Sequence, residues 1–184
     1  MATAAPKRMT VAEFLEWDDG TDTHYELVDG HVVAMAPTLE DHGAIVVDLA
    51  GELRARLSPP CRAIVWAGIV PPDRDDACYE ADVAVTCAPP QSGRRNLAEP
   101  VLIAEVPSPS TALHDFTVKL PDYRRIPSVR EILLVSLQQR RVQVFRRRGE
   151  GWAVEDFIGD AELRLDAVGG EPIPLAAVYA NTAV

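Results

Sequence analysis

Residues 101–106, Val-Leu-Ile-Ala-Glu-Val, form an almost continuous apolar run that only Glu105 interrupts. A run of this kind predicts a central strand that is buried on both faces of a sheet. A helical pattern follows from about Ala112 to Arg125, and Ile132–Val135 is again strand-like. Strand, helix and strand in this order predict a right-handed crossover between two parallel strands. The chain is therefore expected to be an α/β protein.

A β-hairpin is predicted near the start of the chain. Asp29-Gly30 lies between two strand-like segments, residues 25–28 and 31–35, and Asp-Gly favours a tight turn whose central residues both have positive φ. The same criteria predict the remaining elements: a helix at 11–17 with a Thr10/Glu13 capping box, an amphipathic helix carrying Ile45, Val46, Leu49, Leu53 and Leu57, strands at 63–70 and 82–85, and a hairpin of 141–147 with 152–157.

Length and composition predict one domain. The chain has 184 residues, of which 47% are hydrophobic, as expected of one globular unit with a sizeable core. We expect a disordered tail at 1–8 and a single domain at 9–184. No apolar run is long enough to cross a bilayer, and the first residues do not resemble a secretory signal. We therefore expect a cytoplasmic protein without a membrane partner.

The cysteine pattern predicts no covalent or metal framework. There are three cysteines, and none of them forms a CxxC pair. An odd number without that spacing indicates neither a disulfide framework nor a zinc ribbon. We expect Cys61 and Cys87 to be small, semi-buried apolar residues.

The net charge of −10 opposes nonspecific nucleic-acid binding, which requires a positive field. Arginines nevertheless gather at 140–148 and at 124–130. Two interpretations are open, a local basic surface and a solvated hairpin and helix end, and the second is the simpler.

Two carboxylates stand beside apolar strands. Glu105 lies near the end of the central run, and Asp82 directly precedes Val83-Ala84-Val85. A buried carboxylate costs several kcal/mol unless a cation, hydrogen bonds or a metal compensates it. Paired acids at strand ends can hold a hard divalent cation. Each acid could instead cap a turn or pair with an arginine, and the sequence favours neither interpretation.

Lys119 is expected on the helix that follows the Glu105 strand. Asp115, Lys119 and Tyr123 are four residues apart and share one helix face. Of 18 basic residues only Lys7 and Lys119 are lysines, which suggests that a compact ammonium group is required at 119. An exposed Asp–Lys pair is the alternative.

Several segments follow one another in the order of a known family. They are Tyr25-Glu26-Leu27-Val28-Asp29-Gly30, His42, Asp82-Val83, Glu105-Val106-Pro107-Ser108-Pro109-Ser110-Thr111, Asp115 to Lys119, and Tyr123 to Glu131. From about Met9 to Phe145, the chain resembles the Uma-two family, a bacterial group in the PD-(D/E)XK nuclease superfamily.

The resemblance implies a restriction-endonuclease-like core, in which helices flank a mixed β-sheet, with an N-terminal β-hairpin. It implies a Mg²⁺- or Mn²⁺-dependent endonuclease that hydrolyses phosphodiester bonds in nucleic acid, with DNA as the expected substrate, and a symmetric homodimer is a reasonable expectation. Ala81 replaces the usual proline before Asp82, and Pro107 replaces an aliphatic residue. The residues carried over are Asp82, Glu105 and Lys119 as catalytic, Asp82, Glu105 and Glu26 as metal ligands, and Asp115 and Tyr123 as supporting residues.

His42 is a further supporting candidate, because it is expected to begin the long helix, where a helix N-terminus can receive phosphate. The simpler interpretation of His42 is an exposed residue at a helix start.

Two other functions compete with this hypothesis. Paired carboxylates can also hydrolyse glycosidic bonds, but the aromatic fraction is only 6% and sugar clefts depend on aromatic platforms. The stronger rival is a nuclease-fold binding or assembly module without catalysis. In that case the acids should contact arginines and leave no open cation site.

Overall fold

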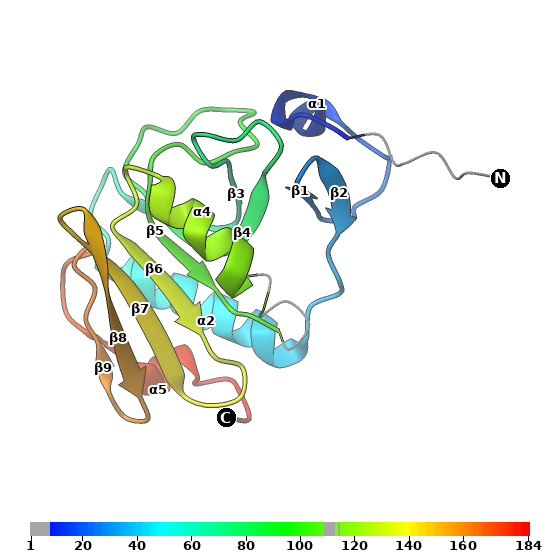
Figure 1. The fold of residues 1–184 in the computed structure, drawn as a ribbon. Helices are drawn as coiled ribbons and strands as arrows, with labels where there is room; N and C mark the ends of the chain where they lie inside the picture. Colours follow the sequence, from blue (N-terminus) through cyan, green and yellow to red (C-terminus); the bar gives the residue numbers. More distant parts are fainter. Residues whose placement is uncertain (1–7, 109–112, 114) are drawn as a thin grey trace.

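The computed structural model describes residues 8–108, 113 and 115–184. Its centre is a six-stranded sheet in the order β3-β4-β5-β6-β7-β8 (Figure 1). The pair β5–β6 is parallel and every other neighbouring pair in this sheet is antiparallel, which confirms the predicted mixed sheet. The strands are β3 (Arg62–Ile69), β4 (Tyr79–Thr86), β5 (Pro100–Glu105), β6 (Glu131–Val135), β7 (Arg141–Arg148) and β8 (Gly151–Ile158).

Strand β5 is buried on both faces because apolar layers cover the two sides of the sheet. Leu102 and Ala104 pack in a cluster with helix α2 (Glu40–Arg56) and helix α5 (Leu175–Val178). Ile103 packs in the opposite cluster with helix α4 (Leu120–Arg125). Figure 1 shows α2 and α4 on opposite sides of the sheet. The continuous apolar run of β5 is thus explained by two cores, as expected.

The crossover from β5 to β6 begins with an unusual helix. Residues Asp115–Lys119 form a π-helical turn, η1, which continues directly into α4. Pro121 has no N–H to donate to the carbonyl of Thr117, so a regular α-helical ladder cannot run through this point. The start of the predicted helix falls on residues 109–112 and 114, and the predicted tail falls largely on residues 1–7; both lie outside the described residues.

The N-terminal hairpin is confirmed and docks against the sheet. Strand β1 (Tyr25–Val28) pairs with β2 (His31–Ala34), and the turn residues Asp29 and Gly30 have φ of 49° and 78°. Backbone hydrogen bonds in both directions join Leu27 to Cys78, at 2.8 and 2.9 Å. This bridge fixes β1 beside the start of β4. Helix α1 (Val11–Glu16) precedes the hairpin and begins with the predicted capping box.

The C-terminal segment covers the core as irregular chain with short elements. Strand β9 (Glu162–Leu163) pairs with β10 (Ile173–Pro174), and α5 follows. Leu163, Ile173 and Val178 join the cluster under α2. Within the described ranges, no helix has both the length and the apolar character needed to traverse a membrane.

The cysteine prediction was wrong, because Cys61 and Cys87 form a disulfide with their Cα atoms 3.9 Å apart. Antiparallel pairing of β3 with β4 places Arg62 opposite Thr86. The next positions outward, Cys61 and Cys87, are therefore brought together by the register. A spacing of 26 residues does not resemble a framework motif, so the pattern alone did not indicate it. Cys78 is free and buried.

The arginines of β7 are paired within the protein. Arg146 bridges buried Glu131 and exposed Glu155, at 2.7 and 2.8 Å, while Arg147 donates to three backbone carbonyls. Arg141 and Arg148 pair with Asp156 and Asp166, at 2.9 Å each. The solvated-hairpin interpretation therefore describes this region better than a basic nucleic-acid surface.

Candidate active site

Asp82 and Glu105 are neighbours across two central strands. The antiparallel register of β4 and β5 pairs Val83 with Ala104, and the next pair outward is Asp82 and Glu105. Both side chains are buried, with exposed fractions of 7% and 3%. The fold thus brings together the two acids that the sequence singled out.

Asp82 is held by the backbone and by a histidine. Its Oδ2 accepts a hydrogen bond from the N–H of Val106 at 2.7 Å. Its Oδ1 lies 3.2 Å from Nε2 of His42, in the first turn of α2. The simpler interpretation of His42 was wrong, because its side chain is only 16% exposed and faces Asp82. Nδ1 of His42 is buried and has no partner within the described residues.

Two residues of the crossover between β5 and β6 contact the Glu105 carboxylate. The hydroxyl of Tyr123 donates to Oε1 of Glu105 at 2.6 Å, and Nζ of Lys119 lies 3.6 Å from the same oxygen. Tyr123 is on α4 and Lys119 ends η1. The predicted common face of Lys119 and Tyr123 is therefore present and is turned toward the acids.

Lys119 also reaches the hairpin. Its Nζ lies 2.7 Å from Oε1 of Glu26 on β1, and the same oxygen accepts the N–H of Glu80 at 2.9 Å. Lys119 is 5% exposed, so the alternative of an exposed Asp–Lys pair was wrong for the lysine. Asp115 starts η1, and its side chain lies outside what the structure describes.

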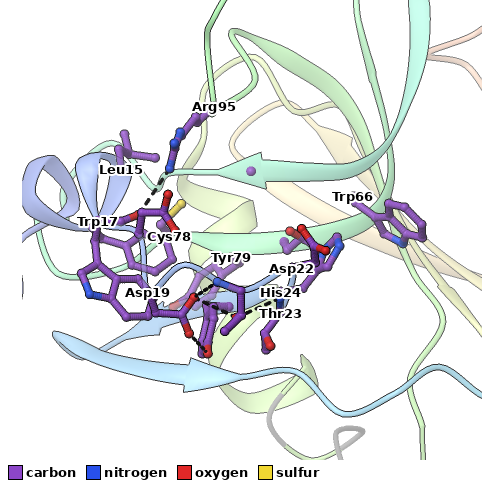
Figure 2. Close-up of a pocket in the computed structure, with 16 residues that line it drawn as sticks. Leu15, Trp17, Asp19, Asp22, Thr23, His24, Trp66, Cys78, Tyr79 and Arg95 are labelled. Carbon is purple, nitrogen blue, oxygen red and sulfur yellow. Dashed lines mark hydrogen bonds and ion pairs between the residues drawn. The ribbon is translucent and has the colours of Figure 1, made fainter.

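Two cavities adjoin these residues. The larger, of about 810 Å³, is lined by five ionisable candidates. The smaller, of about 380 Å³, is lined by residues of α1 and of the segment that follows it (Figure 2). Both cavities are lined by His24, Trp66 and Glu80. The ionisable candidates in the larger cavity are Glu26, His42, Asp82, Glu105 and Lys119.

Comparisons with known proteins identify the family and the fold of this chain. The sequence model of the Uma-two family, described as "Putative restriction endonuclease", matches residues 11–175. The chain belongs to the Uma-two family.

Two curated relatives of this Uma-two chain come from Synechocystis, and both are described as uncharacterized proteins. Slr1290 is 26% identical over 165 residues, covering 88% of this chain and 87% of the relative. Sll1609 is 25% identical over 170 residues, covering 87% and 93%. A crystal structure described as "a putative nuclease belonging to DUF820", from Anabaena variabilis, has a TM-score of 0.74 at 17% identity and covers 94% of this chain and 98% of its own. At that identity the match supports the nuclease-like fold.

The donor set of the Uma-two chain fits a hard divalent cation. In the described part of the chain no three His, Cys, Asp or Glu side chains are grouped as a metal cluster. Mg²⁺, however, is commonly held by one or two carboxylates, with water or phosphate oxygens completing the shell. Asp82 and Glu105 supply two adjacent carboxylates on an open cavity, and the ammonium group of Lys119 already lies between Glu105 and Glu26. The region around these carboxylates therefore accommodates positive charge.

The contrast with Glu131 separates the candidate site from a structural acid. Glu131 is fully buried, pairs with Arg146, and accepts the N–H groups of Asp166 and Ala167 at 3.0 and 2.7 Å. These partners satisfy it, and Glu131 lines neither of the two cavities described above. Asp82 and Glu105 are instead contacted by a backbone N–H, a histidine, a tyrosine and a lysine, and both acids line an open cavity.

Sequence reasoning missed three residues around the site. Glu80 is two residues before Asp82, and Oε1 of Glu80 lies 2.5 Å from Nδ1 of His24. Burial raises the pKa of Glu80 above its ordinary value, and the hydrogen bond from His24 opposes that rise. The aromatic ring of Trp66 lies 5.1 Å from that of His24. The alternation of Glu80 with Asp82 could have indicated the first residue, whereas no pattern indicated Trp66.

Proposed function

We propose that this chain is a Mg²⁺- or Mn²⁺-dependent endonuclease that hydrolyses phosphodiester bonds in DNA. The observation that carries the proposal is the placement of two buried carboxylates, Asp82 and Glu105, side by side on an open cavity with Lys119 next to them. Family membership supports the nuclease class. The identity of the metal and the type of nucleic acid are tested by the experiments given below.

Asp82 and Glu105 would hold the cation, and Glu26 would complete the set from the hairpin, through water. When bound, Mg²⁺ polarises a phosphodiester and lowers the pKa of a coordinated water. The N–H of Val106 and the ring of His42 fix the Asp82 carboxylate. Tyr123 fixes the Glu105 carboxylate. Such fixed ligands keep the carboxylates in place while the substrate binds.

Lys119 would stabilise negative charge that develops on the phosphoryl oxygens, or orient the attacking water. Its Nζ is held between Glu26 and Glu105 at 2.7 and 3.6 Å, so an ammonium group is preorganised beside the proposed metal ligands. His42, in the first turn of α2, would favour a phosphate near the helix N-terminus. Asp115 stays a supporting candidate on the basis of the family resemblance.

The remaining features of this proposal are the assembly and the location. A homodimer would place two such sites on the two strands of a duplex, and the cytoplasm is the location where a bacterial nuclease meets DNA.

The second candidate is a binding or assembly module that keeps the fold without catalysis. The observation in its favour is charge: the net charge is −10, and the arginines of β7 are engaged with the protein's own acids and carbonyls. Such a chain has little positive surface to attract a phosphate backbone.

Calorimetric titration with Mg²⁺ and Mn²⁺ tests the proposal, with wild-type protein beside Asp82→Ala and Glu105→Ala. Glu131→Gln serves as a control, because it alters a buried strand acid away from the cavity. We expect binding in wild type and in the control, and no binding in the two site variants. Plasmid and single-stranded DNA then test cleavage. If the wild type binds neither metal and leaves the plasmid intact, the result would favour the binding module.

A further inference from the structure

Trp66 lies in line with the two candidate metal ligands. In the β3–β4 pairing, Val65 is opposite Val83 and Ala67 is opposite Ala81, so Trp66 lies across from Asp82. Asp82 in turn lies across from Glu105. Adjacent strands are about 4.8 Å apart. The backbone of Trp66 is therefore one strand away from the proposed reaction centre.

The conformation of Trp66 is unusual for a strand residue. Its φ is +51°, a region that bulky L-residues rarely adopt. Its side chain is 54% exposed and lines the larger cavity from β3, the edge strand of the six-stranded sheet. Figure 2 shows the ring standing out from β3, with Asp22 and His24 beside it. Strained backbone conformations of this kind cluster at ligand-binding sites. The ring of Trp66 is therefore a candidate ligand contact.

The surroundings of Trp66 suit an aromatic ring better than a phosphate. His24 contacts the tryptophan edge to face, with 5.1 Å between ring centroids and 72° between planes. Asp22 and Glu80 line both cavities with Trp66, and their carboxylates would repel a phosphate group. Carboxylates can, however, accept hydrogen bonds from the amino groups of bases.

We propose that Trp66 and His24 form a stacking subsite for one unpaired nucleobase next to the scissile phosphate. This inference rests on the proposed nuclease function. A base inside a duplex is stacked on both faces and offers no free ring to Trp66, whereas an extrahelical or single-stranded base does. Stacking also requires little positive charge, which agrees with a chain whose β7 arginines are already paired. The substrate is accordingly DNA with an unpaired nucleotide.

Fluorescence anisotropy in EDTA tests this subsite separately from cleavage. The probes are a blunt duplex, the same duplex with one unpaired cytosine, and the same duplex with an abasic nucleotide in place of that cytosine. The two bulged probes share one backbone, so their affinity ratio isolates the base. We expect wild type to bind the cytosine probe about 10- to 100-fold more tightly than the abasic probe.

Trp66→Ala should reduce this ratio to near one, and Trp66→Phe should retain most of it because it keeps an aromatic face. Val65→Ala, on the adjacent residue of β3, is the control for lost apolar surface and should leave the ratio unchanged. Circular dichroism verifies that each variant is folded. A ratio near one in wild type, or one that persists in Trp66→Ala, would overturn the inference.

The two proposals fail in different ways. If cleavage depends on Asp82 and Glu105 but the cytosine and abasic probes bind equally, the nuclease proposal is supported and the stacking subsite is contradicted. If the cytosine preference depends on Trp66 but no probe is cut with Mg²⁺ or Mn²⁺, base stacking on Trp66 is supported and the nuclease proposal is contradicted.

Discussion

The hydroxyl of Tyr123 donates a hydrogen bond of 2.6 Å to Oε1 of Glu105, the oxygen that Lys119 also approaches. Tyr123 is 1% exposed and packs edge to face on Tyr79, whose own hydroxyl donates to Asp122 at 2.6 Å. The ring is therefore fixed from two sides. The orientation of Glu105 depends on packing in the α4 layer.

Tyr123→Phe should weaken metal binding without abolishing it, because Glu105 keeps its charge but loses one fixed donor. Loss of a hydrogen bond to a buried carboxylate should also lower the free energy of unfolding by about 1–3 kcal/mol. Calorimetry and urea unfolding measure the two effects. Tyr25→Phe is the control, since Tyr25 contacts Asp19 outside the site; equal effects in both variants would contradict a positioning role for Tyr123.

Lys119→Met should destabilise the protein by about 3–5 kcal/mol, because it leaves buried carboxylates without their cation. Adding Glu26→Gln should restore a large part of that loss by removing one of those charges. Urea unfolding of the two single variants and the double variant measures the coupling. The exposed pair of Arg164 and Glu162, 69% and 59% exposed, is the control, and Arg164→Met should cost no more than about 1 kcal/mol. Additive effects of Lys119→Met and Glu26→Gln would show that the ion pair is not formed in solution.

Trp66→Gly should be more stable than Trp66→Ala by about 1 kcal/mol, because glycine adopts positive φ without the steric cost that a Cβ brings. At Val65, which is not among the positive-φ residues of the described chain, the order should reverse by about 0.5–1 kcal/mol. Thermal or urea unfolding of the four variants decides this. The same order at both positions would mean that Trp66 does not hold this backbone conformation in solution.

Glu80 should titrate above its ordinary pKa of 4.5, since burial raises its pKa more than the hydrogen bond from His24 lowers it. A carboxyl with a raised pKa binds its proton more tightly in the folded state. Its contribution to stability is therefore present below about pH 4.5 and is lost as pH rises through the folded-state value. Carbon-detected NMR titration of the Glu80 carboxyl measures the midpoint, and a midpoint below 4.5 would contradict the prediction. Asp76 is the internal comparison, because the hydrogen bond that its carboxylate accepts from Arg74 lowers its pKa.

The disulfide should contribute about 3 kcal/mol to the free energy of unfolding, as a cross-link across a loop of this length does. Replacing Cys61 and Cys87 together by serine, or adding a reductant, should remove that contribution. Cys78→Ser is the control, because Cys78 lies outside the bond. Burial raises the pKa of the Cys78 thiol to about 12, so the folded, oxidised protein should show no reactive thiol and the unfolded, oxidised protein should show one.

The parts of the fold that follow local rules were predictable. The apolar run at 101–106 indicated the central strand, and Asp29-Gly30 indicated the hairpin turn, because each reports its own burial or backbone conformation. The disulfide was not predictable in this way, since the register of β3 and β4 decides which cysteines meet. The position of Trp66 was missed for the same reason: its relation to Asp82 exists only across paired strands.

The sequence predicted the residues of the candidate site better than it predicted their arrangement in space. Asp82 and Glu105 stood out as acids beside apolar strands, and the resemblance to a family ordered the remaining residues. Burial of Lys119 against Glu26 was not evident, because the link between β1 and β4 runs through backbone atoms of Leu27 and Cys78. Side-chain patterns carry no information on such backbone contacts.

Glu26 belongs to the hairpin and Lys119 to the crossover, so their ion pair joins the first part of the chain to its middle across the candidate site. Any event that draws Lys119 away, whether a bound phosphate or a changed charge on Glu105, also weakens the attachment of β1. Residues of the hairpin and the following residues, Met35 to Leu39, line the larger cavity. Binding at the site and the attachment of β1 are thereby coupled through the ammonium group of Lys119. A bound substrate would therefore loosen the cavity wall that surrounds it.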